Sequence, residues 1–103
     1  MDLLNKIAII TGGSGGIGKA MARAFLKEGA RGVVLADLNK EALDQAAGEI
    51  GCDSMVCNVT DQQQINDLAT FTQEKYGQVD LFCSNAGAGG EGLLTDACLL
   101  YTS

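Results

Sequence analysis

The chain has 103 residues, with no histidine, no tryptophan and no proline, and its basic residues are few. Without histidine there is no imidazole base and no imidazole metal ligand, which excludes many hydrolase and zinc mechanisms. Seven Lys and Arg stand against 13 Asp and Glu. The resulting net charge of −6 argues against binding to nucleic acid or to anionic membrane surfaces.

The sequence also lacks a long apolar run and any Cys-x-x-Cys pair. No stretch approaches the ~18 apolar residues of a membrane-spanning helix, and the N-terminal residues lack the basic start and apolar core of a signal peptide. The four cysteines do not have zinc-site spacing, and we expect no metal site. We therefore expect a cytoplasmic protein without membrane contact, whose cysteines are reduced and behave as small apolar residues.

What the chain does have is a glycine-rich segment between a strand-like run and a helix-like run. The segment Thr11–Gly18 has the sequence TGGSGGIG and follows an apolar run at 6–11. Residues at helical spacing follow, with the expected apolar face Ile17, Ala20, Met21, Ala24 and Phe25. A strand, a glycine-rich turn and a helix in this order form an anion site, because the helix N-terminus presents unpaired N–H groups. We therefore expect a dinucleotide as the ligand.

Strand-like and helix-like segments alternate along the rest of the chain. Strands are expected at 32–37, 54–57 and 79–84. Asn39 is expected to cap one helix, and Thr60 to cap another in a capping box with Gln63. This βαβαβαβ order predicts an α/β fold, a Rossmann-like doubly wound parallel sheet with strand order 3-2-1-4 and helices on both faces. The first and fourth strands should then bring the glycine-rich segments 11–18 and 85–90 together at the ligand site.

Asp37 closes the second strand, 19 residues after Gly18. A carboxylate at about this spacing (~20 residues) binds the adenosine ribose hydroxyls of NAD. It would repel the 2′-phosphate of NADP, and neither Gly15 nor Leu38 supplies a compensating cation. The sequence therefore predicts NAD rather than NADP as the cofactor. The alternative is that Asp37 only caps the following helix.

The same glycines almost fit the phosphate-binding loop of NTPases. Gly13 and Gly18 have the right spacing, and Lys19 follows them. The match fails at Ala20, where a Ser or Thr is needed to hold Mg²⁺. An NTPase is therefore the less favoured enzymatic interpretation.

Taken together, the motifs resemble those of the short-chain dehydrogenase/reductase family over about residues 5–92. The chain has Thr-Gly-x-x-x-Gly-Ile-Gly at 11–18, and Asp37 follows the second strand. Asn-Val-Thr at 58–60 and Asn-Ala-Gly at 85–87 follow the third and fourth strands, in the family's order and spacing.

The resemblance implies cofactor-binding positions in the glycine segment and after three later strands: Gly12, Ser14, Gly16, Ile17, Gly18, Asp37, Asn58, Val59, Asn85, Ala86 and Gly87. In the family, an Asp usually stands at position 58 and contacts the adenine amino group, and an Asn oxygen can still accept that hydrogen bond. The Asn-Ala-Gly motif lies along the cofactor and steadies the sheet. The alternative for Asn85 is a loop hydrogen bond without ligand contact.

The family's catalytic residues lie beyond position 103. They are a Ser, a further Asn and a Tyr-x-x-x-Lys pair, whose Tyr is the general acid/base. Tyr76 is followed four residues later by Asp80 rather than Lys, and Tyr101 stands three residues from the end. We therefore assign no catalytic residue to this chain.

The resemblance thus implies that residues 1–96 are the N-terminal NAD-binding half of a dehydrogenase. The parent enzyme would transfer a hydride between nicotinamide and a small alcohol or ketone, and would be a homo-oligomer. We expect residues 97–103 to be a truncated or non-native tail, and the fourth strand to have an open apolar edge. The alternative is a stand-alone dinucleotide-binding or regulatory module without catalysis.

Overall fold

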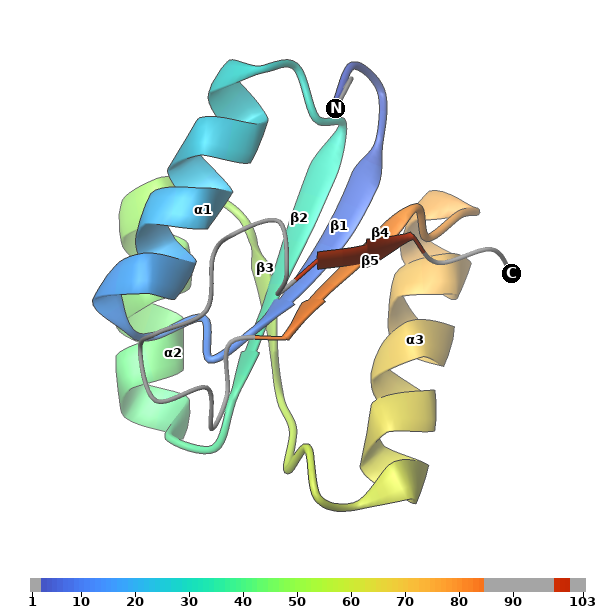
Figure 1. Ribbon diagram of the computed structural model, residues 1–103. Coiled ribbons are helices and arrows are strands. Elements are labelled where there is room, and N and C mark those ends of the chain that lie inside the picture. The colour runs from blue at the N-terminus through green and yellow to red at the C-terminus, as the bar shows by residue number, and fades with distance from the viewer. Residues whose placement is uncertain (1–2, 85–97, 101–103) are drawn as a thin grey trace.

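The computed structural model describes residues 3–84 and 98–100, and it shows a single sheet with helices on both faces (Figure 1). The elements are β1 (Ile7–Thr11), α1 (Gly16–Lys27), β2 (Gly32–Asp37), α2 (Lys40–Ile50), β3 (Asp53–Val56), α3 (Gln62–Tyr76), β4 (Leu81–Ser84) and β5 (Cys98–Leu100). The strand order is β3-β2-β1-β4-β5. The first four strands are parallel, which confirms the predicted order 3-2-1-4 of a doubly wound α/β fold.

β5 corrects the expectation that β4 has an open edge. The backbone of β5 pairs with β4 in antiparallel orientation, with Leu99 opposite Phe82. The sequence pattern did not indicate this strand, because three residues are too few to show an alternation of apolar and polar positions. β5 therefore covers the edge of β4 from within the segment 97–103.

The cysteines differ in one respect from the expected reduced state. Cys52 and Cys57 carry free thiols, whereas Cys83 is disulfide-bonded. In the backbone register of β4 and β5, Cys98 stands opposite Cys83. Burial, with help from the nearby Asp53 charge, raises the pKa of Cys52 to about 11, so this thiol is protonated at neutral pH.

Each face of the sheet has its own apolar core. On one face, Met21 of α1 and Leu43 of α2 pack against strand residues that include Leu35. On the other face, Leu68 of α3 packs against strand residues that include Val34. β1 and β2 are almost wholly buried because both of their faces are covered, as expected for central parallel strands. Among the described residues, no helix has the length and apolar character needed to cross a membrane.

The buried face of α1 matches the predicted one only in part: Met21 is buried and Phe25 packs against the core, as predicted. Gly18, Met21 and Ala22 are buried, whereas Ile17 is 48% exposed and Ala20 is also exposed. A Cβ atom on Gly18 would lie 2.4 Å from the Gly12 carbonyl oxygen. Because Gly18 has no side chain, the helix backbone lies directly against the glycine segment, and the face around Gly18 rather than Ile17 is turned to the sheet.

The start of α3 also lies one residue later than predicted. Asp61, not Thr60, is the N-cap, and its carboxylate accepts hydrogen bonds from the N–H groups of Gln63 and Gln64. The Thr60 hydroxyl is engaged elsewhere, because it donates to the side-chain oxygen of Asn58. In contrast, the predicted cap of α2 is confirmed, since Asn39 accepts from the Ala42 N–H.

Candidate functional site

The chain adds β2 and β3 on one side of β1 and then crosses to the other side of β1 to add β4. Because β1 and β4 are parallel, their carboxyl ends lie at the same edge of the sheet. Thr11 at the end of β1 lies between Ala36 of β2 and Ser84 of β4 in the register. The buried Thr11 hydroxyl donates to the Cys83 carbonyl at 3.4 Å and joins the two strand ends. In open α/β sheets, ligands bind outside the carboxyl ends of the strands at this reversal.

The glycine segment is folded tightly against the ends of β1 and β2. The Gly13 N–H donates to the Ala36 carbonyl at 3.0 Å, and the Gly15 N–H donates to the Gly12 carbonyl at 3.2 Å. Gly12 has a φ of 67°, a left-handed conformation that side chains disfavour. These two hydrogen bonds and the close contact between Gly18 and Gly12 fix the glycine turn, so that the N-terminus of α1 lies at the carboxyl edge of the sheet.

The N-terminus of α1 has the properties of an anion site. Its N-cap is Gly15, which has no side chain to satisfy the first N–H groups, and its first turn contains no acidic residue. At Gly16 a Cβ would meet nothing within 4 Å, so packing within the described residues gives no reason for glycine there. A diphosphate would use this open space, because its oxygens can approach the exposed N–H groups closely.

Asp37 lies beside this helix N-terminus. Its carboxylate oxygen Oδ2 accepts hydrogen bonds from the Ser14 hydroxyl and from the Ser14 N–H, the latter at 3.1 Å. Burial by itself would raise the pKa of Asp37, but the bonds from Ser14 and from the Leu38 N–H outweigh it and hold the pKa below its ordinary value. Asp37 is therefore ionised at neutral pH. Because Asn39 caps α2, the alternative that Asp37 merely caps that helix is wrong.

Asn58 follows β3 at the same edge of the sheet, and its oxygen is already in use. Its Oδ1 accepts from the Thr60 N–H at 3.0 Å and from the Thr60 hydroxyl at 2.7 Å. The Asn58 N–H donates to Gln64 at 2.9 Å, and its carbonyl accepts from Asp61 at 3.0 Å. The side chain is therefore held in one orientation.

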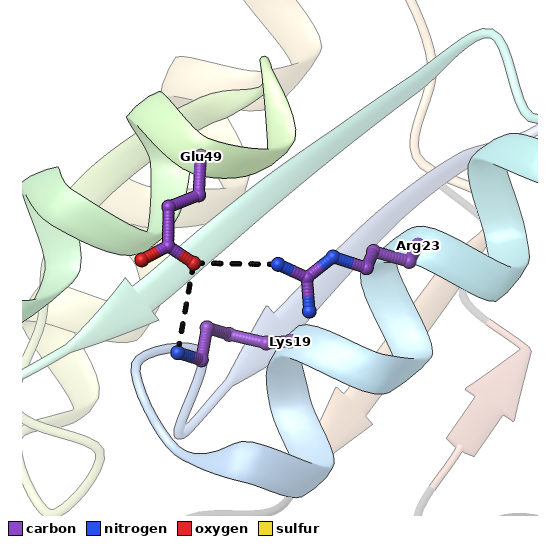
Figure 2. Close-up of polar contacts among 3 residues, drawn as sticks. All are labelled: Lys19, Arg23 and Glu49. Atoms are coloured by element: carbon purple, nitrogen blue, oxygen red, sulfur yellow. Dashed lines mark hydrogen bonds and ion pairs between the residues drawn. The ribbon is translucent and has the colours of Figure 1, made fainter.

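Lys19, the residue that gave the glycine segment its likeness to an NTPase loop, is paired with α2. Its Nζ lies 3.7 Å from the Glu49 carboxylate, and Arg23 contacts the same oxygen at 3.3 Å (Figure 2). Figure 2 shows both basic side chains extending from α1 toward Glu49. This pairing gives no support to the NTPase interpretation, which needs the lysine at the phosphates.

The structure thus brings together most of the residues that the sequence singled out. Around the ends of β1, β2 and β3 lie Gly12, Ser14, Gly16, Ile17, Gly18, Asp37, Asn58 and Val59. Asn85, Ala86 and Gly87 lie outside the described residues.

Sequence reasoning did not single out Leu38 as a candidate site residue. This side chain follows Asp37 and is 65% exposed, and Val56 at the end of the neighbouring strand is also exposed. The sequence did contain a signal for it, because Leu38 is an apolar residue that belongs neither to a strand nor to the apolar face of a helix. Together the two side chains offer apolar surface beside an ionised carboxylate.

Comparison with known proteins supports one family. The family model described as short chain dehydrogenase matches residues 6–99. Over 88 residues the chain is 43% identical to "(-)-isopiperitenol/(-)-carveol dehydrogenase, mitochondrial" from Mentha piperita, covering 82% of this chain and 33% of that protein. The chain therefore spans about a third of the length of this curated relative.

Two crystal structures share the arrangement of strands and helices. A short chain dehydrogenase from Mycobacterium smegmatis has a TM-score of 0.79 and 33% identity, covering 92% of this chain and 42% of that one. The 3-ketoacyl-(acyl-carrier-protein) reductase from Brucella melitensis, complexed with NADH, has a TM-score of 0.70 and 32% identity. That match covers 76% of this chain and 32% of the reductase chain.

Proposed function

Because the chain belongs to the short chain dehydrogenase family, we propose that it is the NAD-binding part of an oxidoreductase acting on a small alcohol or ketone. The observation that carries the proposal is the ionised carboxylate of Asp37 next to an uncapped helix N-terminus at the carboxyl edge of a parallel sheet. The two groups suit the two polar parts of an adenosine diphosphate: a diol and a diphosphate.

The diphosphate is bound by backbone groups in this proposal. The N–H groups at the start of α1 donate to its oxygens, and the positive end of the helix dipole favours its charge. Gly16 leaves the space that the diphosphate occupies, and Gly18 keeps the helix close to the turn. Ser14 and Ile17 border the same position, and the exposed Ile17 side chain shields one side of it.

Asp37 determines which dinucleotide binds. Its carboxylate accepts from a ribose hydroxyl of NAD through Oδ1, where the Leu38 N–H occupies only one of the two lone pairs. A 2′-phosphate would instead place two like charges together. Leu38 and Val59 provide contact for the base beyond the ribose. The NADH complex of the Brucella melitensis reductase supports the cofactor class, and Asp37 supports NAD over NADP.

Catalysis belongs, in this proposal, to residues outside the printed sequence. Bound nicotinamide supplies hydride transfer. Tyr76 is unsuited to the acid/base role because its hydroxyl donates to Asp53 at the start of β3, at the end of the sheet opposite the site. Burial and Asp53 raise its pKa to about 12, far above the pKa of a general acid/base that operates near neutral pH.

The expected substrate, oligomeric state, location and domain boundary are based on the family resemblance and stay proposals. The dehydrogenase from Mentha piperita is named for alcohols, which supports a small alcohol or ketone substrate. A homo-oligomeric parent enzyme, a cytoplasmic location and the boundary between a half-domain at 1–96 and a tail at 97–103 stay predictions. A stand-alone dinucleotide-binding module is the second candidate, because the site lies within this chain.

Calorimetric titration of the full chain with NAD and NADP tests the proposal, with Asp37→Ala as the variant. The exposed Glu74 near the C-terminal end of α3 provides a control, since Glu74→Ala also removes one carboxylate, at the end of the sheet opposite the site. We expect wild type to bind NAD at least about tenfold more tightly than NADP. Hydrogen bonds to a charged group contribute about 1.5–3 kcal/mol, so Asp37→Ala should weaken NAD binding about tenfold or more.

Glu74→Ala should change neither affinity. Equal affinities of wild type for NAD and NADP would contradict the role of Asp37, and the absence of binding to either would contradict the proposed function. Thermal unfolding of each variant verifies that the fold is retained.

A further inference from the structure

Most of the hydrogen-bonding capacity of the Asp37 carboxylate is taken up by the protein itself. An ionised carboxylate has about four lone-pair positions, two on each oxygen. Oδ2 accepts from the Ser14 N–H at 3.1 Å and from the Ser14 hydroxyl, and Oδ1 accepts from the Leu38 N–H at 2.8 Å. Among the residues that the structure describes, three donors therefore occupy three of these positions. One position is left for a ligand, and it is on Oδ1.

The two bonds from Ser14 join two separate parts of the site. Ser14 lies in the glycine turn before α1, Asp37 ends β2, and both residues are partly buried. They are 23 residues apart, so the fold rather than a local turn brings them together. Hydrogen bonds to a charged acceptor are about twice as strong as those between neutral groups, so we expect both bonds to persist when a ligand binds. Ser14 therefore fixes the orientation of the carboxylate through Oδ2.

A ribose diol offers two hydroxyl donors, one more than this carboxylate can accept. We propose that Ser14 is a positioning residue that limits Asp37 to a single ribose hydroxyl. The site then binds one of the two monodeoxy forms of NAD, with a 2′-deoxy or a 3′-deoxy adenosine ribose, nearly as well as NAD itself. This inference rests on the proposed function and specifies which sugars the site accepts.

Substitution of Ser14 should change the number of hydroxyls that Asp37 accepts. Ser14→Ala removes the hydroxyl donor but keeps the N–H donor, so Oδ2 gains one vacant lone pair. Ser14 is not among the residues with a positive φ, so alanine can adopt its backbone conformation. Both ribose hydroxyls can then bond to the carboxylate. Ser14→Thr retains the hydroxyl and should restore the wild-type behaviour.

Calorimetric titration of the full chain with NAD and with its two monodeoxy forms tests the inference. We expect one monodeoxy form to bind wild type within about threefold of NAD. The other should bind about tenfold more weakly or worse, the effect of losing one hydrogen bond to a charged group. With Ser14→Ala, both forms should bind about tenfold more weakly than NAD. A purely structural role of Ser14 would instead weaken all three ligands by the same factor.

Thr70→Ala provides the matched control, because it also removes one side-chain hydroxyl. Thr70 is exposed on α3, which covers the face of the sheet opposite α1. Thr70→Ala should bind NAD and its two monodeoxy forms with the wild-type affinities.

Equal losses for the two monodeoxy forms in wild type, or the same pattern in wild type and Ser14→Ala, would overturn the inference while leaving NAD binding intact. Failure of wild type to bind NAD would instead refute the proposed function, and this inference with it.

Discussion

Replacement of Gly16 by Ala separates a glycine required by the fold from a glycine required by a ligand. A Cβ at this position would have no described atom within 4 Å. Gly16 is also not among the glycines with positive φ, so alanine can adopt its backbone conformation. The apo protein should therefore tolerate Gly16→Ala, whereas a diphosphate bound at the start of α1 should not.

The size of each effect can be estimated. Glycine to alanine at a compatible position stabilises by about 0.4–1 kcal/mol, chiefly because the unfolded chain loses conformational freedom. Binding should change in the opposite direction, since the new methyl group occupies the approach of the diphosphate to the helix N–H groups. Loss of hydrogen bonds to a charged group, at about 1.5–3 kcal/mol, corresponds to a tenfold or greater increase in the dissociation constant for NAD.

Gly48 provides the matched control, because it lies within α2 and a Cβ there also meets nothing within 4 Å. Urea unfolding should show both variants as stable as wild type or slightly more stable. Calorimetry with NAD should show a loss of affinity for Gly16→Ala alone. If Gly16→Ala binds NAD as tightly as wild type, the diphosphate does not lie against this helix turn.

Three further predictions concern stability. Gly18→Ala places a Cβ 2.4 Å from a backbone carbonyl oxygen, so we expect urea unfolding to show a loss of about 1–3 kcal/mol, and unchanged stability would contradict the close packing. Tyr76→Phe removes a hydrogen bond to Asp53 and should cost about 1 kcal/mol. Because the pKa of Tyr76 is raised to about 12 in the folded chain, wild-type stability should fall as pH rises from about 10 to 12, and Tyr76→Phe should show a smaller decline. The pKa of Asp37 is lowered, so its contribution is present above the unfolded value of 3.8 and is lost as pH falls below it; acid titration of Ser14→Ala should show a smaller loss over that range than wild type.

The fold could be predicted largely from apolar patterning and turn residues. The strand β2, Gly32–Asp37, has no polar alternation, and it is buried on both faces as that pattern indicates. The helix α2 follows its predicted cap Asn39, because a side-chain acceptor there satisfies an otherwise unpaired N–H. These are local signals, and the parallel order of the strands follows from their alternation with helices.

Features that depend on contacts between distant segments could not be predicted in this way. The rotation of α1 is set by the close approach of Gly18 to Gly12, and apolar periodicity alone favoured Ile17 instead. β5 is determined by pairing with β4, which its own three residues do not indicate.

Motif spacing located the candidate site but not its hydrogen bonds. Asp37 could be identified from its spacing, whereas its two bonds from Ser14 depend on the shape of the turn. In the same way, the sequence identified Asn58 but not the saturation of its oxygen by Thr60, which changes what this residue can offer a ligand.

The central claim is that a dinucleotide lies across the carboxyl edge of the sheet, from the start of α1 to the end of β3. Titration of ¹⁵N-labelled full chain with NAD, followed by backbone amide spectra, tests it most directly. We predict that the largest shifts occur at Gly15–Gly18, at Asp37 and Leu38, and at Asn58, while the amides near Tyr76 at the opposite end of the sheet stay unchanged. Shifts that cluster near Tyr76, or no shifts at millimolar NAD, would contradict the account.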